Sequence, residues 1–149
     1  MSGTQPSSAL ELITTIAITA GSVALFLYWF RYTCMLILTA QSAHDYAGSL
    51  AETKGLEFPN VQAQLRTNAN RDLDNLYRAL DRDYAVIRPL LETSGTDAVQ
   101  ARMLGLYYQT LRACYTATRA FSPSATRRAL DEMATVIAHF ANVAGEAAA

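Results

Sequence analysis

The sequence has no excess of basic residues, and this shortage excludes one large class of partners. Its 149 residues carry 12 Lys and Arg against 13 Asp and Glu, for a formal net charge of −1. Binding to nucleic acid generally requires a concentrated basic surface. We therefore expect no nucleic-acid partner.

Cysteine is almost absent too, with only Cys34 and Cys114 in the chain. Neither belongs to a CxxC pair, and two cysteines do not make a disulfide framework. We interpret both as small buried apolar residues. Unpaired thiols are typical of a reducing compartment.

The residue patterns that carry catalysis or metal binding are missing. His44 and His139 are the only histidines, and we expect both at the surface or at the edge of the core. The sequence contains no HExxH, CxxCH, GxxxxGK[ST] or GxSxG motif. It also lacks the ExxH pair found in di-iron helical bundles. We therefore predict no catalytic residue, no metal site and no cofactor.

One long apolar run dominates what is present. After a polar tail over 1–11, the 19 residues from Leu12 to Phe30 carry no formal charge. As a helix they would span roughly 28 Å, close to the thickness of a bilayer's hydrocarbon core. Tyr, Trp and Arg favour the headgroup level, which defines a predicted membrane-interface belt: Tyr28, Trp29, Phe30, Arg31 and Tyr32. We predict a single transmembrane helix over 12–32.

Three other interpretations of this run compete with a span over 12–32. The span could instead cover 20–38, which would leave Arg31 inside the membrane as a functional residue. The run could be a buried helix of a soluble protein, because Thr14, Thr15, Thr19 and Ser22 reduce its hydrophobicity. A cleaved signal peptide is disfavoured, because no Lys or Arg precedes the run and its length exceeds a typical signal core.

Charge also gives an orientation for this helix. The tail over 1–11 lacks Lys and Arg, whereas Arg31 flanks the other end. Cytoplasmic flanks are enriched in basic residues, so we expect the C-terminal domain in the cytoplasm.

Small residues follow one face of the predicted span at steps of three and four: Thr14, Ala17, Gly21 and Ala24. Such a face lets helix backbones approach closely in lipid. We predict that it packs on another transmembrane helix, either of a second copy or of a partner subunit. The alternative is a bystander stripe in an alanine-rich chain.

The rest of the chain predicts an all-α fold. No Pro or Gly lies between Gly21 and Gly48, so the anchor helix is expected to continue over 33–54 and to end at Gly55. Apolar residues at helical spacing predict a small antiparallel bundle of three further helices over 60–143. Their predicted starts are Asn60, Asp97 and Ser122-Pro123, and Asn68-Ala69-Asn70 marks a kink or break. The Ala-rich tail over 144–149 is expected to fray.

Tyrosine occupies several positions of the predicted helices at which a helical bundle usually has leucine. Tyr107 and Tyr108 are adjacent, so both are not expected to point into one core. An amphipathic edge of the core is the plain interpretation of these tyrosines, and a docking surface at Tyr107 and Tyr108 is the alternative that we carry forward. Together these features predict a membrane-anchored helical scaffold or accessory subunit that mediates protein–protein interaction without catalysis. A small membrane-bound sensor is the alternative, followed by an enzyme or cofactor carrier that uses His44 or His139.

Overall fold

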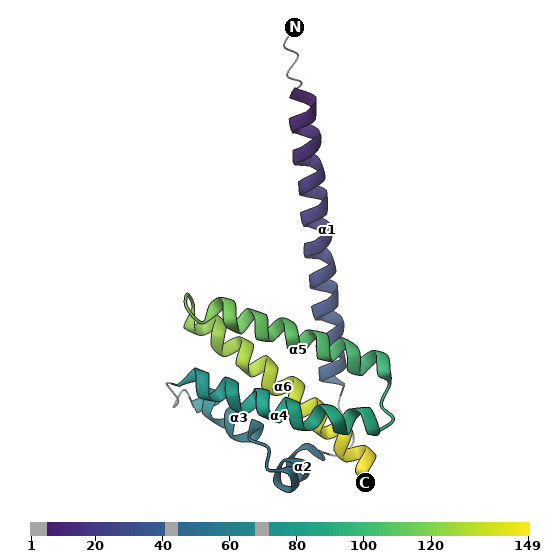
Figure 1. The fold of residues 1–149 in the computed structure, drawn as a ribbon, viewed down its shortest axis with the longest axis vertical. Coiled ribbons are helices and arrows are strands. Elements are labelled where there is room, and N and C mark those ends of the chain that lie inside the picture. Colours follow the sequence, from purple (N-terminus) through teal and green to yellow (C-terminus); the bar gives the residue numbers. More distant parts are fainter. Residues whose placement is uncertain (1–5, 41–44, 68–71) are drawn as a thin grey trace. The chain divides into compact units, whose positions relative to one another are not determined.

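A computed structural model describes residues 6–40, 45–67 and 72–149, and within these ranges it is entirely helical, without strands (Figure 1). The chain divides into two compact units, Met1–Ile37 and Leu38–Ala149. The described part holds six helices: α1 (Pro6–Thr39), α2 (Ala47–Lys54), α3 (Phe58–Thr67), α4 (Leu73–Thr93), α5 (Ala98–Thr118) and α6 (Pro123–Ala148). The all-α prediction is confirmed there, whereas the predicted count of one plus three helices is wrong.

The helix α1 is long and apolar enough to cross a membrane. Three threonines lower the hydropathy of α1, but their hydroxyls are hydrogen-bonded within the helix and are therefore compatible with an apolar surrounding. The Oγ1 atoms of Thr14, Thr15 and Thr19 each donate to the carbonyl oxygen four residues earlier, at 2.8 Å. A hydroxyl with an internal acceptor loses less on leaving water than a free one does.

The predicted continuation of the anchor helix over 33–54 is wrong, because α1 ends at Thr39 and α2 is a separate helix. Side chains take the backbone donors at the start of α2. Asn142 Oδ1 accepts the N–H of Tyr46 at 2.7 Å, and Asp45 Oδ1 accepts that of Ala47 at 3.1 Å. The predicted end of the helix is confirmed, since Gly55 has φ of 67° directly after α2.

The first of the three helices expected in the domain, which was to begin at Asn60, is two helices, α3 and α4. The suggested break at Asn68-Ala69-Asn70 lies outside the described residues. The other helix starts follow the sequence signals: Asp97 accepts the N–H of Val99 at 3.0 Å, and Ser122 Oγ accepts that of Ala125 at 3.3 Å.

The start of α3 is held by a residue of another helix, which is why the predicted cap at Asn60 is wrong. Asp83 of α4, only 4 % exposed, accepts the N–H groups of Glu57 and Phe58 on one oxygen, Oδ2, at 2.8 and 2.6 Å. Burial raises the pKa of this carboxyl, and the two backbone hydrogen bonds oppose part of that rise. A buried carboxylate therefore serves as the N-cap of a neighbouring helix.

Within the second unit, α6 is the central element and packs against α2, α3, α4 and α5. In Figure 1 its yellow ribbon passes between α4 and α5. Its fully covered side chains form the middle of the core: Leu130, Met133, Ala134, Val136, Ile137 and Ala141. The helix α6 continues to Ala148, and its residues Ala144 and Gly145 are buried, whereas 146–149 are exposed and their fraying stays a prediction.

Candidate functional site

Two stacked tyrosine pairs connect α4 to α5. Tyr77 lies on Tyr115 with ring centroids 4.3 Å apart, and Tyr84 lies on Tyr108 at 4.0 Å. The rings of each pair are almost parallel, at 4° and 9°. Seven positions separate the pairs on each helix, and the numbering runs in opposite directions, as it must between antiparallel helices. We call these four residues the tyrosine ladder.

The charged groups beside the ladder interact with residues of the other helix. Arg112 of α5 donates from Nε to Tyr77 Oη at 3.1 Å and lies 3.3 Å from Asp81 Oδ1. The hydroxyl of Tyr115 donates to Asp74, which also lies 3.9 Å from Arg119 Nη1. Burial raises the pKa of Tyr115, so this hydroxyl stays a donor. Acidic residues of α4 therefore pair with Arg112 of α5 and with Arg119, the residue that caps α5.

The predicted docking surface at Tyr107 and Tyr108 is wrong, because their side chains are 3 % and 0 % exposed. Two different helices cover them, which lets adjacent residues both lie in the core. Tyr107 donates its hydroxyl to Glu132 of α6, whereas Tyr108 stacks on Tyr84 of α4. The Tyr108 hydroxyl has no hydrogen-bond partner among the described residues.

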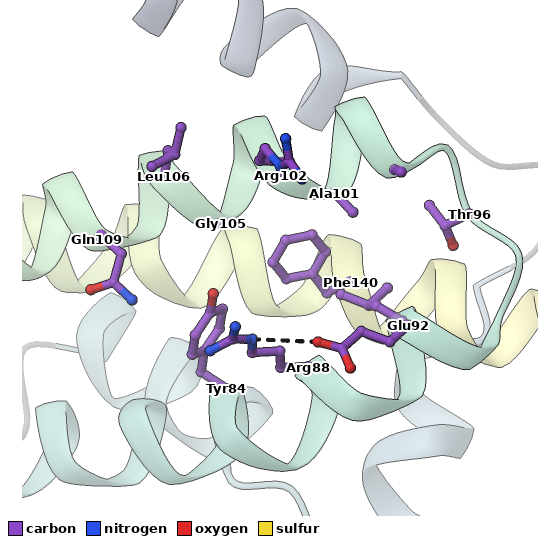
Figure 2. A pocket seen from close by; sticks show the side chains of 12 residues that line it. Tyr84, Arg88, Glu92, Thr96, Ala101, Arg102, Gly105, Leu106, Gln109 and Phe140 are labelled. Carbon is purple, nitrogen blue, oxygen red and sulfur yellow. Dashed lines mark ion pairs between the residues drawn. The ribbon is translucent and has the colours of Figure 1, made fainter.

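Beside the ladder, α4 and α5 enclose a groove of about 540 Å³ (Figure 2). The ring of Phe140, from α6, lies between the two helices at its centre, and the Tyr84 hydroxyl points toward Gly105. A Cβ atom at Gly105 would lie 3.4 Å from Tyr84 Oη, so a larger residue would narrow the groove here. Leu91, Ala98, Ala101 and Leu106 add apolar wall.

The polar rim of the groove is more basic than acidic. Arg88 and Glu92 form an exposed pair at 3.7 Å, which contributes little in water. Arg102 is exposed and forms no ion pair within the described ranges. Burial raises the pKa of Tyr84, which keeps its hydroxyl protonated. The groove has an apolar floor, with arginine and hydroxyl donors at its edge. Such a site suits a ligand segment that has an apolar side chain and a neighbouring carboxylate.

The predicted residues of the anchor all lie on α1, away from this groove in the sequence. In the belt, Trp29 and Tyr32 meet edge to face with centroids 6.0 Å apart. On the small-residue face, the space where a Gly21 side chain would project is open to 4 Å. Neither observation tests a membrane or a partner, so the belt and the packing face stay predictions.

The residues considered for chemistry are not gathered into one site. His139 is half-buried on α6, its Nε2 3.5 Å from Gln100 Nε2, and burial lowers its pKa. His44 lies outside the described residues. No cluster of three His, Cys, Asp or Glu side chains suited to a metal occurs in the ranges that the structure covers.

One cysteine interpretation needs correction, because Cys114 is exposed on α5. The inward positions of that turn are taken by Leu111 and Tyr115, which leaves Cys114 on the flank of the helix.

Comparisons with protein-family models, curated proteins and solved structures find no match to this chain. The groove was missed in the sequence because it depends on how three helices meet. The sequence did contain one usable signal: tyrosines seven apart on each of two successive helices, Tyr77 with Tyr84 and Tyr108 with Tyr115. Such a repeat would have predicted the ladder but not the space beside it.

Proposed function

We propose that the protein is a membrane-anchored helical scaffold or accessory subunit that binds a partner protein through the groove between α4 and α5. The observation that carries this proposal is the groove itself, with Phe140 at its centre and Arg102 at its rim. The occupant we infer is a partner segment that places an apolar side chain over Phe140 and a carboxylate against Arg102. The role is non-catalytic, and α4, α5 and α6 act as the antiparallel bundle that presents the groove.

The anchor in this proposal is α1. Its length and apolar composition suit a single membrane crossing. The hydroxyls of Thr14, Thr15 and Thr19 are satisfied within the helix, which supports an apolar surrounding. Arg31 flanks the apolar run on the C-terminal side, so the domain lies in the cytoplasm. The sensor alternative relied on one continuous helix into the domain, and α1 ends at Thr39.

The groove is tested by filling it in the full-length protein. Ala101 lines the groove, and Ala101→Trp would occupy it. Ala85 is exposed on α4 and does not line the groove, so Ala85→Trp is a matched control of the same size. A photo-crosslinker at Gln109, at the groove edge, identifies what lies there in native membranes.

We expect a stoichiometric partner to crosslink from Gln109 and to co-purify in mild detergent with the A85W variant but not with A101W. Partner binding that survives A101W would show that the groove is not the binding site. A protein that remains monomeric and uncrosslinked throughout would contradict the scaffold proposal.

A further inference from the structure

The side of α5 that faces away from the core is unusually poor in charge. Positions at steps of three and four share this side: Val99, Arg102, Leu106, Thr110, Ala113 and Ala117. We call them the outer face of α5. Val99 is 66 % exposed and Leu106 56 %, and Phe121, just beyond the helix, is 85 % exposed. A helix face that only meets water normally carries more charge than this.

The charges that are present have one sign. No Asp or Glu occurs from Ala98 to Leu130, whereas this segment holds five arginines. Several of them are neutralised by acidic residues of other segments, as Arg112 is by Asp81. Arg102 is not, and it lies one turn from both Val99 and Leu106 on the outer face. The outer face of α5 therefore consists of apolar and small side chains, with one positive charge that no acidic residue of the described ranges neutralises.

The tether keeps this domain close to the bilayer, an argument that rests on the proposed membrane anchor. Thr39, at the end of α1, and Ala47, at the start of α2, are eight positions apart. Eight residues reach at most about 28 Å even when fully extended. A bilayer surface is therefore always within reach of the domain, and its effective concentration there is high.

We infer that, while no partner fills the groove, the outer face of α5 lies on the surface of an anionic bilayer, so that the bilayer and the partner compete for Arg102 and Leu106. Val99, Leu106 and Phe121 would enter the headgroup region, while Arg102 would meet the phosphates and anionic headgroups. Helices that lie in the membrane interface combine such apolar residues with basic ones. The lack of acidic residues over 98–130 removes the repulsion that an anionic surface would otherwise exert on this segment.

The inference is tested by tryptophan quenching in the full-length protein. Trp29 is the only tryptophan and is replaced by Phe, which leaves the introduced residue as the sole reporter. Leu106→Trp reports on the outer face of α5. Val86→Trp is the control, because Val86 is also an exposed apolar residue, 42 % exposed, but on α4. The proteins are reconstituted into vesicles of brominated phosphatidylcholine, with and without phosphatidylglycerol.

We expect the bromines to quench the tryptophan at 106 in vesicles that contain phosphatidylglycerol, and to leave the one at 86 bright. Adding Arg102→Gln should reduce the ratio of docked to undocked protein about five-fold, the effect of one arginine near an anionic surface. Circular dichroism verifies that each variant keeps its helices.

Equal quenching at 106 and 86, or none at 106, would overturn the inference. An unquenched but blue-shifted tryptophan at 106, dependent on protein density, would also overturn it, since a second copy would then cover the face. Flotation and carbonate resistance of the same vesicles test α1 separately. Protein that stays in the membrane with an unquenched Leu106→Trp reporter contradicts only this inference, whereas protein that leaves the membrane contradicts the anchor as well.

Discussion

Gly145 lies so close to Tyr46 that a Cβ atom at Gly145 would be 2.6 Å from the Tyr46 Cβ and 3.2 Å from its carbonyl oxygen. One turn earlier on α6, Asn142 accepts the Tyr46 N–H. The last turns of α6 therefore hold the residue that precedes α2. This contact fixes the start of α2 against the end of α6, and only glycine permits it at this distance.

We predict that Gly145→Ala destabilises the domain by about 1–3 kcal/mol, the usual effect of forcing extra atoms into a packed site. Both Tyr46 Cβ and its backbone would have to move, so the change is not absorbed by a flexible side-chain end. Urea unfolding of the full-length protein in mild detergent, followed by circular dichroism, measures the loss.

Gly48→Ala is the matched control, because nothing lies within 4 Å of the added Cβ in the described structure. Gly48 is in the helix α2, where alanine is favoured over glycine by about 0.5–1 kcal/mol. The two alanine substitutions should therefore act in opposite directions. Equal effects of both would show that the contact with Tyr46 is not restrictive.

Asp83 provides a second prediction, because it is the buried cap of α3. Asp83→Ala removes the acceptor of the Glu57 and Phe58 N–H groups, and the buried Phe58 N–H left without a partner costs about 1–3 kcal/mol. Asp83→Asn keeps an acceptor oxygen of similar shape and should retain most of the stability. If Asn were as damaging as Ala in urea unfolding, the capping role would be wrong.

The comparison of wild type with Asp83→Asn also predicts how stability depends on pH. Burial raises the folded-state pKa of Asp83, so the folded protein holds its proton more tightly than the unfolded chain does. Stability from this group is complete below the ordinary aspartate pKa of about 3.9 and declines as pH rises through the higher folded value. As pH rises, the urea midpoint of wild type should therefore fall relative to that of D83N, because asparagine does not titrate. A pH-independent difference would contradict the raised pKa.

Tyr107 and Tyr108 give opposite predictions for the same substitution. Tyr108→Phe removes a buried hydroxyl without a partner in the described structure and should stabilise the domain by about 1 kcal/mol. Tyr107→Phe removes the hydrogen bond to Glu132 and should destabilise it by a similar amount. Thermal unfolding compares the two variants directly. A loss of stability in Y108F would mean that its hydroxyl has a partner after all.

Features that depend on neighbouring residues were predictable from the sequence. Gly55 ends a helix because glycine adopts positive φ readily, and Ser122-Pro123 starts one by local capping. Features set by distant residues were not predictable: Tyr46 is bound by Asn142, 96 positions away. The start of α2, the start of α3 and the groove all depend on such contacts.

Cys114 provides a test of orientation, because it is exposed on α5. In a Cys34→Ala background, a membrane-impermeant maleimide should label Cys114 only after the cells are permeabilised, since we place the domain in the cytoplasm. Ser8→Cys, with both native cysteines replaced, marks the opposite flank of α1 and should be labelled in intact cells. Labelling of Cys114 from outside would reverse the proposed orientation.

The small-residue face of α1 gives the last prediction. Replacing Ala17 and Gly21 with Leu should abolish association with another transmembrane helix, because the added side chains keep the backbones apart. Thr15 and Thr19 lie on the opposite side of the helix, so T15L/T19L is the control with the same number of leucines. Association is measured by energy transfer between labelled helices in vesicles. Equal association in both variants would mean that helix contact does not use this face, and equal loss in both would indicate a general effect of leucine on insertion.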